Sequence, residues 1–206
     1  MLELKNIYKT FNPGTVNAKT ALEDLNLTLN EGDFVTVIGG NGAGKSTMLN
    51  AVAGAFSVDA GTITIDGQNV TGLPEYKRAA FIGRVFQDPM MGTAATMQIE
   101  ENLALAARRG QRRGLRTLEL GLEDRMTAKV GLLSGGQRQA LTLLMAALKR
   151  PKLLLLDEHT AALDPKTAAK VLSLSDQIVE ENGLTTLMVT HNMRDAIAHG
   201  NRLIMM

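Results

Sequence analysis

Apolar positions recur along the chain with two different spacings. Short runs that alternate apolar and polar residues, or that are apolar throughout, are typical of strands, whereas apolar residues three or four positions apart are typical of helices. Strand-like runs occupy residues 2–7, 25–29, 34–38, 61–67, 82–86, 153–156, 185–190 and 202–206. Helix-like stretches occupy residues 48–53, 100–107, 137–148, 166–181 and 193–198.

The order of these segments predicts the fold class. Strands that alternate with helices form a parallel sheet with right-handed crossovers. The wholly apolar run at 153–156 is typical of a buried parallel strand, whereas the alternating run at 2–7 is typical of an antiparallel edge. We therefore expect an α/β fold with a mostly parallel sheet, an N-terminal antiparallel β subdomain and an inserted helical subdomain.

A glycine-rich segment joins the strand at 34–38 to the helix at 48–53. Its residues, Gly39, Gly40, Asn41, Gly42, Ala43, Gly44, Lys45, Ser46 and Thr47, have the spacing of a phosphate-binding loop. Such a loop aims backbone N–H groups at phosphate, Lys45 adds a charge for the β and γ phosphates, and Ser46 offers a hydroxyl to Mg²⁺. A chance match is expected in roughly one such chain in a hundred, and the flanking strand and helix lower that figure. We expect the core of a P-loop NTPase.

Composition limits the remaining possibilities. A chain of 206 residues with 45% hydrophobic content predicts a single domain, 1–206, with a lobe at about 88–150. The net charge of +1 and the 3% aromatic content argue against nucleic acid as a partner. Cysteine is absent, which excludes disulfides and thiolate metal sites. The longest apolar stretch, 140–148, is too short to span a membrane, and the N-terminus lacks a signal-peptide pattern.

Two adjacent carboxylates, Asp157 and Glu158, follow the buried strand at 153–156. Open α/β sheets bind ligands at the carboxyl ends of their strands. Because neighbouring strand residues point in opposite directions, Asp157 can face Mg²⁺ while Glu158 orients and deprotonates a water molecule. An acidic turn that merely ends a strand is the alternative, and the nearby phosphate loop argues against it.

Two further features are weaker evidence of function when each is taken alone. Ser134, Gly135, Gly136 and Gln137 precede a helix, where the serine can cap the helix and the glycines let N–H groups approach an anion. This pattern is also an ordinary cap. His191 follows the strand at 185–190, where a lone histidine is usually structural or exposed, but its place downstream of Asp157 and Glu158 favours a γ-phosphate contact.

Together these residues resemble the ATP-binding cassette (ABC) ATPases, and the resemblance covers essentially the whole chain in family order. The matching motifs are the phosphate loop Gly39 to Thr47, the Q-loop residue Gln87, the signature Leu133 to Gln137, the Walker B residues Asp157 and Glu158, the D-loop Ala162 to Asp164, and the switch histidine His191.

The resemblance implies a sandwich of two cassettes, with ATP between the phosphate loop of one and the signature of the other. It makes Glu158 the general base and adds His191, Lys45 and Gln87 as further catalytic residues. It also implies that Ser46, Gln87 and Asp157 bind Mg²⁺. Phe11 stacks on adenine by this pattern. The implied nucleotide-binding set is Phe11, Gly39, Asn41, Gly42, Ala43, Gly44, Lys45, Ser46, Thr47, Ser134, Gly135, Gly136, Gln137 and Asp164.

Several positions depart from the family pattern. His159 replaces the usual proline after the glutamate, which we interpret as a subgroup marker without a catalytic role, and Gly40 replaces a common loop proline. Residues 115–118 join two pieces abruptly and similar proteins continue past Met206, so we expect missing residues at both places. The five arginines within 108–116 are typical of a solvated face, or can approach lipid headgroups or a membrane partner.

The resemblance therefore implies the ATPase subunit of a bacterial-type importer at the cytoplasmic face of the plasma membrane. Its partners are a second copy of itself or a related cassette, transmembrane permease subunits and a substrate-binding protein. Met90 and Met91, just after Gln87, can meet a permease helix. The motifs look like a subgroup associated with amino-acid uptake. The alternatives are an exporter ATPase and a cytosolic ABC protein that moves no solute, although the paired cassettes or long coiled coil of such proteins are absent here.

Overall fold

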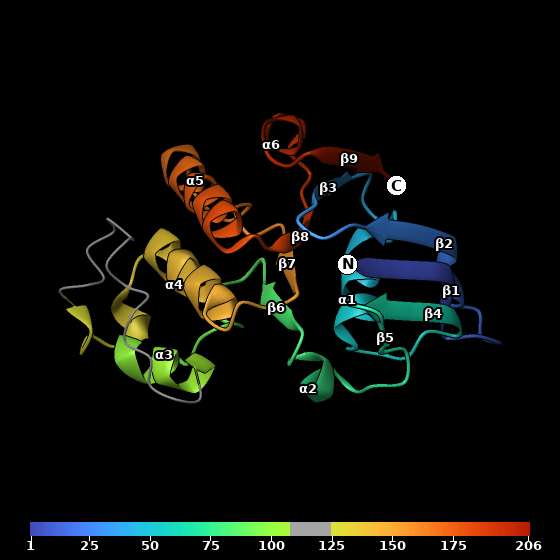
Figure 1. Cartoon of the computed structure of the whole chain (residues 1–206), viewed down its shortest axis with the longest axis horizontal. Coiled ribbons are helices and arrows are strands. Elements are labelled where there is room, and N and C mark those ends of the chain that lie inside the picture. The colour runs from blue at the N-terminus through green and yellow to red at the C-terminus, as the bar shows by residue number, and fades with distance from the viewer. Residues whose placement is uncertain (108–124) are drawn as a thin grey trace.

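The computed structural model describes residues 1–107 and 125–206, and Figure 1 shows their arrangement. The arginine run at 108–116 and the junction at 115–118, both interpreted above, lie outside these residues. The strands are β1 Leu2–Phe11, β2 Lys19–Leu29, β3 Phe34–Ile38, β4 Ala60–Ile65, β5 Gln68–Asn69, β6 Ile82–Val85, β7 Leu153–Asp157, β8 Thr185–Val189 and β9 Arg202–Met205. The helices are α1 Lys45–Ala53, α2 Glu75–Arg78, α3 Ile99–Ala107, α4 Gly135–Ala147, α5 Pro165–Asn182 and α6 Met193–Ala198, with a 3₁₀ turn at Val130–Leu132.

The predicted α/β fold is confirmed. Five parallel strands form one sheet in the order β6-β7-β8-β3-β9, and an antiparallel sheet has the order β2-β1-β4-β5. Both β1 and β2 are longer than their alternating patterns predicted. Their pairing shifts register after Leu4, and Asn6 and Asp24 take left-handed backbone angles there. Such a bulge breaks the period of two without ending the strand, which explains the underestimate.

The parallel sheet separates two hydrophobic cores. Along β7, Leu153 and Leu155 pack into the core formed with α1 and the antiparallel sheet, whereas Leu154 and Leu156 pack into the core formed with α4 and α5. Figure 1 shows α1 and α4 on opposite sides of β6 and β7 accordingly. The phosphate loop and the signature therefore begin helices on opposite faces of one sheet. The single domain and its lobe at 88–150 stay a prediction.

The end of α1 is held by a buried arginine that the sequence pattern did not single out. Arg78, at the end of the four-residue helix α2, is 2% exposed. Its guanidinium donates to the carbonyls of Ala51 and Val52, at 2.7 and 2.9 Å, and to two further carbonyls beside α2. A cation at a helix C-terminus satisfies orphan carbonyls and complements the helix dipole. Arg78 thus fixes the far end of the helix that starts at the phosphate loop.

We predict that Arg78→Met destabilises the fold by about 3 kcal/mol, because four carbonyls lose a charged donor and at least two of them are buried. Urea unfolding monitored by circular dichroism measures the effect. Lys77→Met, an exposed change in the same helix, is the matched control and is expected to lie within about 0.5 kcal/mol of the wild type. Equal stabilities of the two variants would contradict the structural role of Arg78.

His159 lies in the loop after β7 and is 2% exposed. Its Nε2 lies 3.0 Å from the Ser175 hydroxyl on α5, and that hydroxyl donates its proton to the carbonyl of Val171 at 2.9 Å. The Ser175 oxygen must therefore accept a hydrogen bond from His159, so the proton of the neutral ring is on Nε2. Burial lowers the pKa of His159 to about 4, so the ring is neutral at pH 7. The residue anchors the loop that follows Glu158 to α5.

This burial predicts a pH-dependent stability. The pKa of His159 falls from 6.5 in the unfolded chain to about 4 in the fold. The stabilisation by neutral His159 is therefore complete above pH 6.5, and the free energy of unfolding decreases as pH falls towards 4. The expected loss is about 3 kcal/mol. His159→Gln keeps a neutral donor and removes the titration. Urea unfolding between pH 7.5 and pH 4 is expected to show a steeper loss for the wild type than for this variant. Parallel curves would refute the assignment.

Candidate functional site

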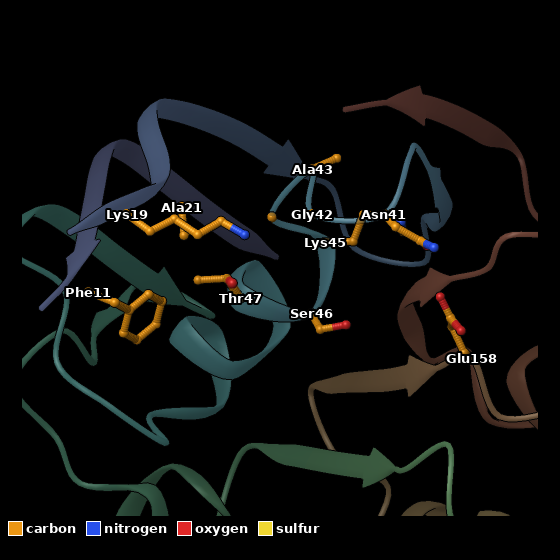
Figure 2. Close-up of a pocket in the computed structure, with 11 residues that line it drawn as sticks. Phe11, Lys19, Ala21, Asn41, Gly42, Ala43, Lys45, Ser46, Thr47 and Glu158 are labelled. Atoms are coloured by element: carbon orange, nitrogen blue, oxygen red, sulfur yellow. The ribbon is translucent and has the colours of Figure 1, made fainter. Parts of the chain in front are cut away.

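A cavity of about 230 Å³ opens at the carboxyl end of β3, between the phosphate loop and the first two strands (Figure 2). Most of its lining comes from the loop that the sequence singled out. The lining residues are Phe11, Lys19, Ala21, Asn41, Gly42, Ala43, Gly44, Lys45, Ser46, Thr47 and Glu158. The structure therefore brings Phe11 and Glu158 to the same cavity as the phosphate loop, although 147 positions separate the two residues in the chain.

The loop holds its lysine beneath the cavity. Lys45 is 6% exposed, and its Nζ donates to the carbonyls of Gly39 and Gly40 at 2.8 and 3.0 Å. Gly44 has φ +93°, and a Cβ there would lie 2.5 Å from the carbonyl oxygen of Ala21. Only glycine fits this turn, which aims Lys45 and Ser46 into the start of α1. The geometry is that of an anion site at a helix N-terminus.

Hard oxygen donors converge beside this helix start. The Ser46 hydroxyl lies 3.5 Å from Oδ1 of Asp157, which ends β7. Oxygen ligands of this kind are what Mg²⁺ prefers, so Ser46 and Asp157 fit a magnesium site. Burial raises the pKa of Asp157, the nearby charge of Arg84 opposes this shift, and Glu158 adds to it. This end of the sheet thus contains a carboxylate that is costly to leave without a cation.

Glu158 and His191 form a pair at the same edge of the sheet. Oε2 of Glu158 lies 3.3 Å from Nδ1 of His191, which follows β8. Glu158 has φ +44°, in the left-handed region. The expectation that strand alternation separates Glu158 from Asp157 was wrong, because the strand ends at Asp157 and the turn itself redirects Glu158. The two carboxylates still face different partners, and a strained non-glycine residue is typical of functional sites.

The signature segment lies away from this cavity. Ser134 caps α4: its hydroxyl accepts from the N–H of Gln137 at 3.3 Å, and the Gln137 side chain accepts from the N–H of Ser134 at 3.1 Å. A Cβ on Gly136 would collide with the side chain of Thr167 at the start of α5, which Asp164 caps. Among the described residues, neither Ser134 to Gln137 nor Asp164 lines the cavity.

The Q-loop residue is placed next to the signature helix rather than in the cavity. Gln87 is exposed and follows β6. The preceding carbonyl, that of Phe86, accepts from Nε2 of the buried Gln139 on α4 at 3.0 Å. Arg138 donates to the sulfur of Met90 at 2.5 Å. The first turns of α4 are thus bonded directly to both sides of Gln87.

Sequence reasoning missed three residues near the site. Lys19 and Ala21 on β2 line the cavity, and Figure 2 shows the Lys19 side chain extending towards the loop. No motif marks them, because they reach the site only through the pairing of β2. Arg84 approaches Asp157 to 3.6 Å. Its signal was available, since it is a charged residue within the otherwise apolar strand at 82–86.

Comparison with known proteins agrees with this geometry. Residues 22–161 match the family model described as ABC transporter. The chain is 45% identical to a tyrosine transport ATP-binding protein of Clostridioides difficile, covering all of this chain and 88% of that protein. It is 35% identical to a spermidine/putrescine import ATP-binding protein of Haemophilus ducreyi, again over all of this chain but only 55% of the relative.

A solved structure has the same fold. The dimeric, post-hydrolysis state of the ATP-binding cassette MJ0796, bound to ADP and phosphate, is 32% identical with a TM-score of 0.83, covering all of this chain and 94% of that one. Within the described residues, no helix is long and apolar enough to cross a membrane. With the family model matching more than half of its length and a relative matching all of it, the chain belongs to the ABC transporter family as an ATP-binding ATPase subunit.

Proposed function

We propose that this subunit binds Mg²⁺-ATP at the phosphate-loop cavity and hydrolyses it between two cassettes to drive the uptake of an amino acid. The observation that supports this most directly is the convergence of Lys45, the Ser46–Asp157 oxygens and the Glu158–His191 pair at one edge of the parallel sheet. The name of the tyrosine transport relative supports an amino acid as the substrate.

Binding of the triphosphate follows from the loop. Backbone N–H groups at the start of α1 and the Lys45 ammonium provide fixed positive potential for the β and γ phosphates. Phe11 lines the cavity and has an edge-to-face contact with Phe56, with ring centroids 5.3 Å apart, so its ring is held for stacking on a base. Ser46 and Asp157, with Gln87 from the neighbouring loop, would hold Mg²⁺, which neutralises charge on the phosphates.

Hydrolysis needs a base that can order a water molecule. Glu158 is 21% exposed and lines the cavity, so it can contact a water beside the terminal phosphate. His191, more exposed, contacts Oε2 of Glu158 from the same end of the neighbouring strand β8. We assign proton acceptance to Glu158 and contact with the γ-phosphate to His191. Most of the acceleration comes from positioning and fixed charge.

A second cassette completes this site. Ser134 to Gln137 begin a helix on the other face of the sheet, so one chain cannot present its signature to its own phosphate loop. Head-to-tail pairing of two copies places each signature N-terminus over the partner's cavity, where N–H groups can meet the γ-phosphate. The dimeric structure of the related cassette supports this arrangement.

We predict that Glu158→Gln lowers ATP turnover by at least about a hundredfold, because the amide cannot accept the water proton. The variant is also expected to form a stable dimer with ATP. Phosphate release and size-exclusion chromatography measure the two effects. Glu180→Gln, the same change at an exposed position on α5, is the control and should behave like the wild type. Unchanged turnover together with a monomeric Glu158→Gln protein would show that Glu158 is not the base.

The surface beside Gln87 suits a permease subunit. Met90 and Met91 are 46% and 70% exposed, and Tyr76 and Leu105, which are also exposed, border a groove of their own. Exposed apolar side chains next to one another mark interaction sites, and methionines adapt to helical partners. Docking of this surface on the permease holds the subunit at the cytoplasmic face of the membrane, with a substrate-binding protein on the other side.

We expect Met91→Glu to weaken this docking, because a charge would be buried against an apolar partner. The measurement is the fraction of the subunit recovered with washed membranes after expression in its own host. The wild type should sediment with the membranes and Met91→Glu should move mostly to the supernatant. Val16→Glu changes an apolar residue that is even more exposed than Met91 and lies far from Gln87 in sequence, and this variant should still sediment. Equal distributions of all three proteins would contradict this docking surface.

A further inference from the structure

Arg84 is a largely buried cation beside the carboxylate of the proposed magnesium site. Its side chain is 12% exposed, and that of its neighbour Asp157 is 14% exposed. One nitrogen, Nη2, lies 2.6 Å from Oδ1 of Asn50 on α1 and 3.6 Å from Oδ2 of Asp157 on β7. The guanidinium also lies over the ring of Phe86, with its carbon 4.4 Å from the centroid. Arg84 therefore contacts β7 and the phosphate-loop helix from β6.

The contacts divide the Asp157 carboxylate into two sides. Oδ2 faces Arg84, whereas Oδ1 faces the hydroxyl of Ser46. An outer cation that holds one carboxylate oxygen leaves the other directed at the metal position. Because Arg84 approaches Oδ2 and Ser46 approaches Oδ1, Arg84 can orient Asp157 while Oδ1 stays available to a metal ion between Asp157 and Ser46.

A second observation connects Arg84 with the outside of the molecule. Arg84 lines a groove of about 350 Å³, here called the α2–α3 groove, together with Tyr76, Leu105, Ala106 and Met145. Tyr76 and Leu105 are exposed apolar side chains, so this groove can receive a partner segment. Nε of Arg84 is buried and has no hydrogen-bond partner among the described residues. The same side chain thus borders the groove at one end and contacts the metal carboxylate at the other.

We propose that Arg84 is a positioning residue that aims Asp157 at Mg²⁺ and transmits occupation of the α2–α3 groove to the metal site. This inference rests on the proposed Mg²⁺-ATP function. A partner segment that fills the groove presses on the Arg84 stem, and a shift of the guanidinium turns Asp157 relative to Ser46. Metal affinity then depends on whether the groove is filled.

The test measures Mn²⁺ binding by electron paramagnetic resonance on the purified chain with a non-hydrolysable ATP analogue. Arg84→Met is expected to weaken Mn²⁺ binding about tenfold, as loss of an outer partner of a metal ligand does. Arg84→Lys keeps the charge and should recover most of the affinity. Arg202→Met removes an arginine paired with another carboxylate, Asp33, and should leave Mn²⁺ affinity unchanged. Melting temperatures verify that each variant is folded.

The groove is tested by filling it. The chain contains no cysteine, so Ala106→Cys offers a single thiol for a bulky maleimide. Labelling should change the Mn²⁺ dissociation constant by about threefold or more with Arg84 present, and by much less in Arg84→Met, because coupled positions are non-additive.

The outcomes separate the two proposals. Mn²⁺ affinity that is unchanged or higher in Arg84→Met overturns the positioning role, and an equal effect of labelling in both backgrounds overturns the connection to the groove. A wild-type chain that binds the nucleotide analogue but no Mn²⁺ overturns the proposed magnesium site itself.

Discussion

The structure depends on accommodating buried charges where the parallel strands end. Lys45 and Asp157 both lie largely out of water, where an uncompensated charge costs several kcal/mol. Lys45 is compensated by carbonyls of its own loop, whereas Asp157 is compensated from two other elements, by Ser46 on α1 and by Arg84 on β6. Asp157 is therefore compensated only while β6, β7 and α1 keep their mutual positions, so the sheet and the site form as one unit.

Local sequence predicted those parts of the fold that local interactions determine. β3 and α6 have the predicted bounds, and α5 differs by one residue at each end, because their periodicity and caps agree. The phosphate loop was predictable because a cavity for phosphate needs glycine, lysine and a hydroxyl in one short segment. Prediction failed where contacts with distant residues determine the local structure or where an element is very short. The bulge at Asn6 extends β1 through a break in alternation, and α2 is too short to show a period.

The candidate site shows the same division. Its motif residues were found from the chain alone, whereas Lys19 and Arg84 take their meaning from pairing partners that the local sequence does not reveal. The left-handed turn at Glu158 was unexpected, since no glycine marks it. It is held by neighbours: the N–H of Glu158 donates to the carbonyl of Val189, and the buried His159 is bonded to α5. Tertiary contacts thus offset strain that local preference would avoid.

The arrangement of the two half-sites has a mechanical consequence. Within one chain the phosphate loop and the signature lie on opposite faces of the sheet, yet the first turns of α4 are bonded to both sides of Gln87 through Gln139 and Arg138. The close approach of Gly136 to Thr167 also joins these turns to the start of α5. In the proposed dimer, a partner that engages the signature would therefore act on a segment bonded to the loop around Gln87 and packed against the start of α5. Because these ties are hydrogen bonds and close packing rather than a flexible linker, closure at one half-site of the proposed dimer would displace residues near the other half-site and couple the two nucleotides through α4.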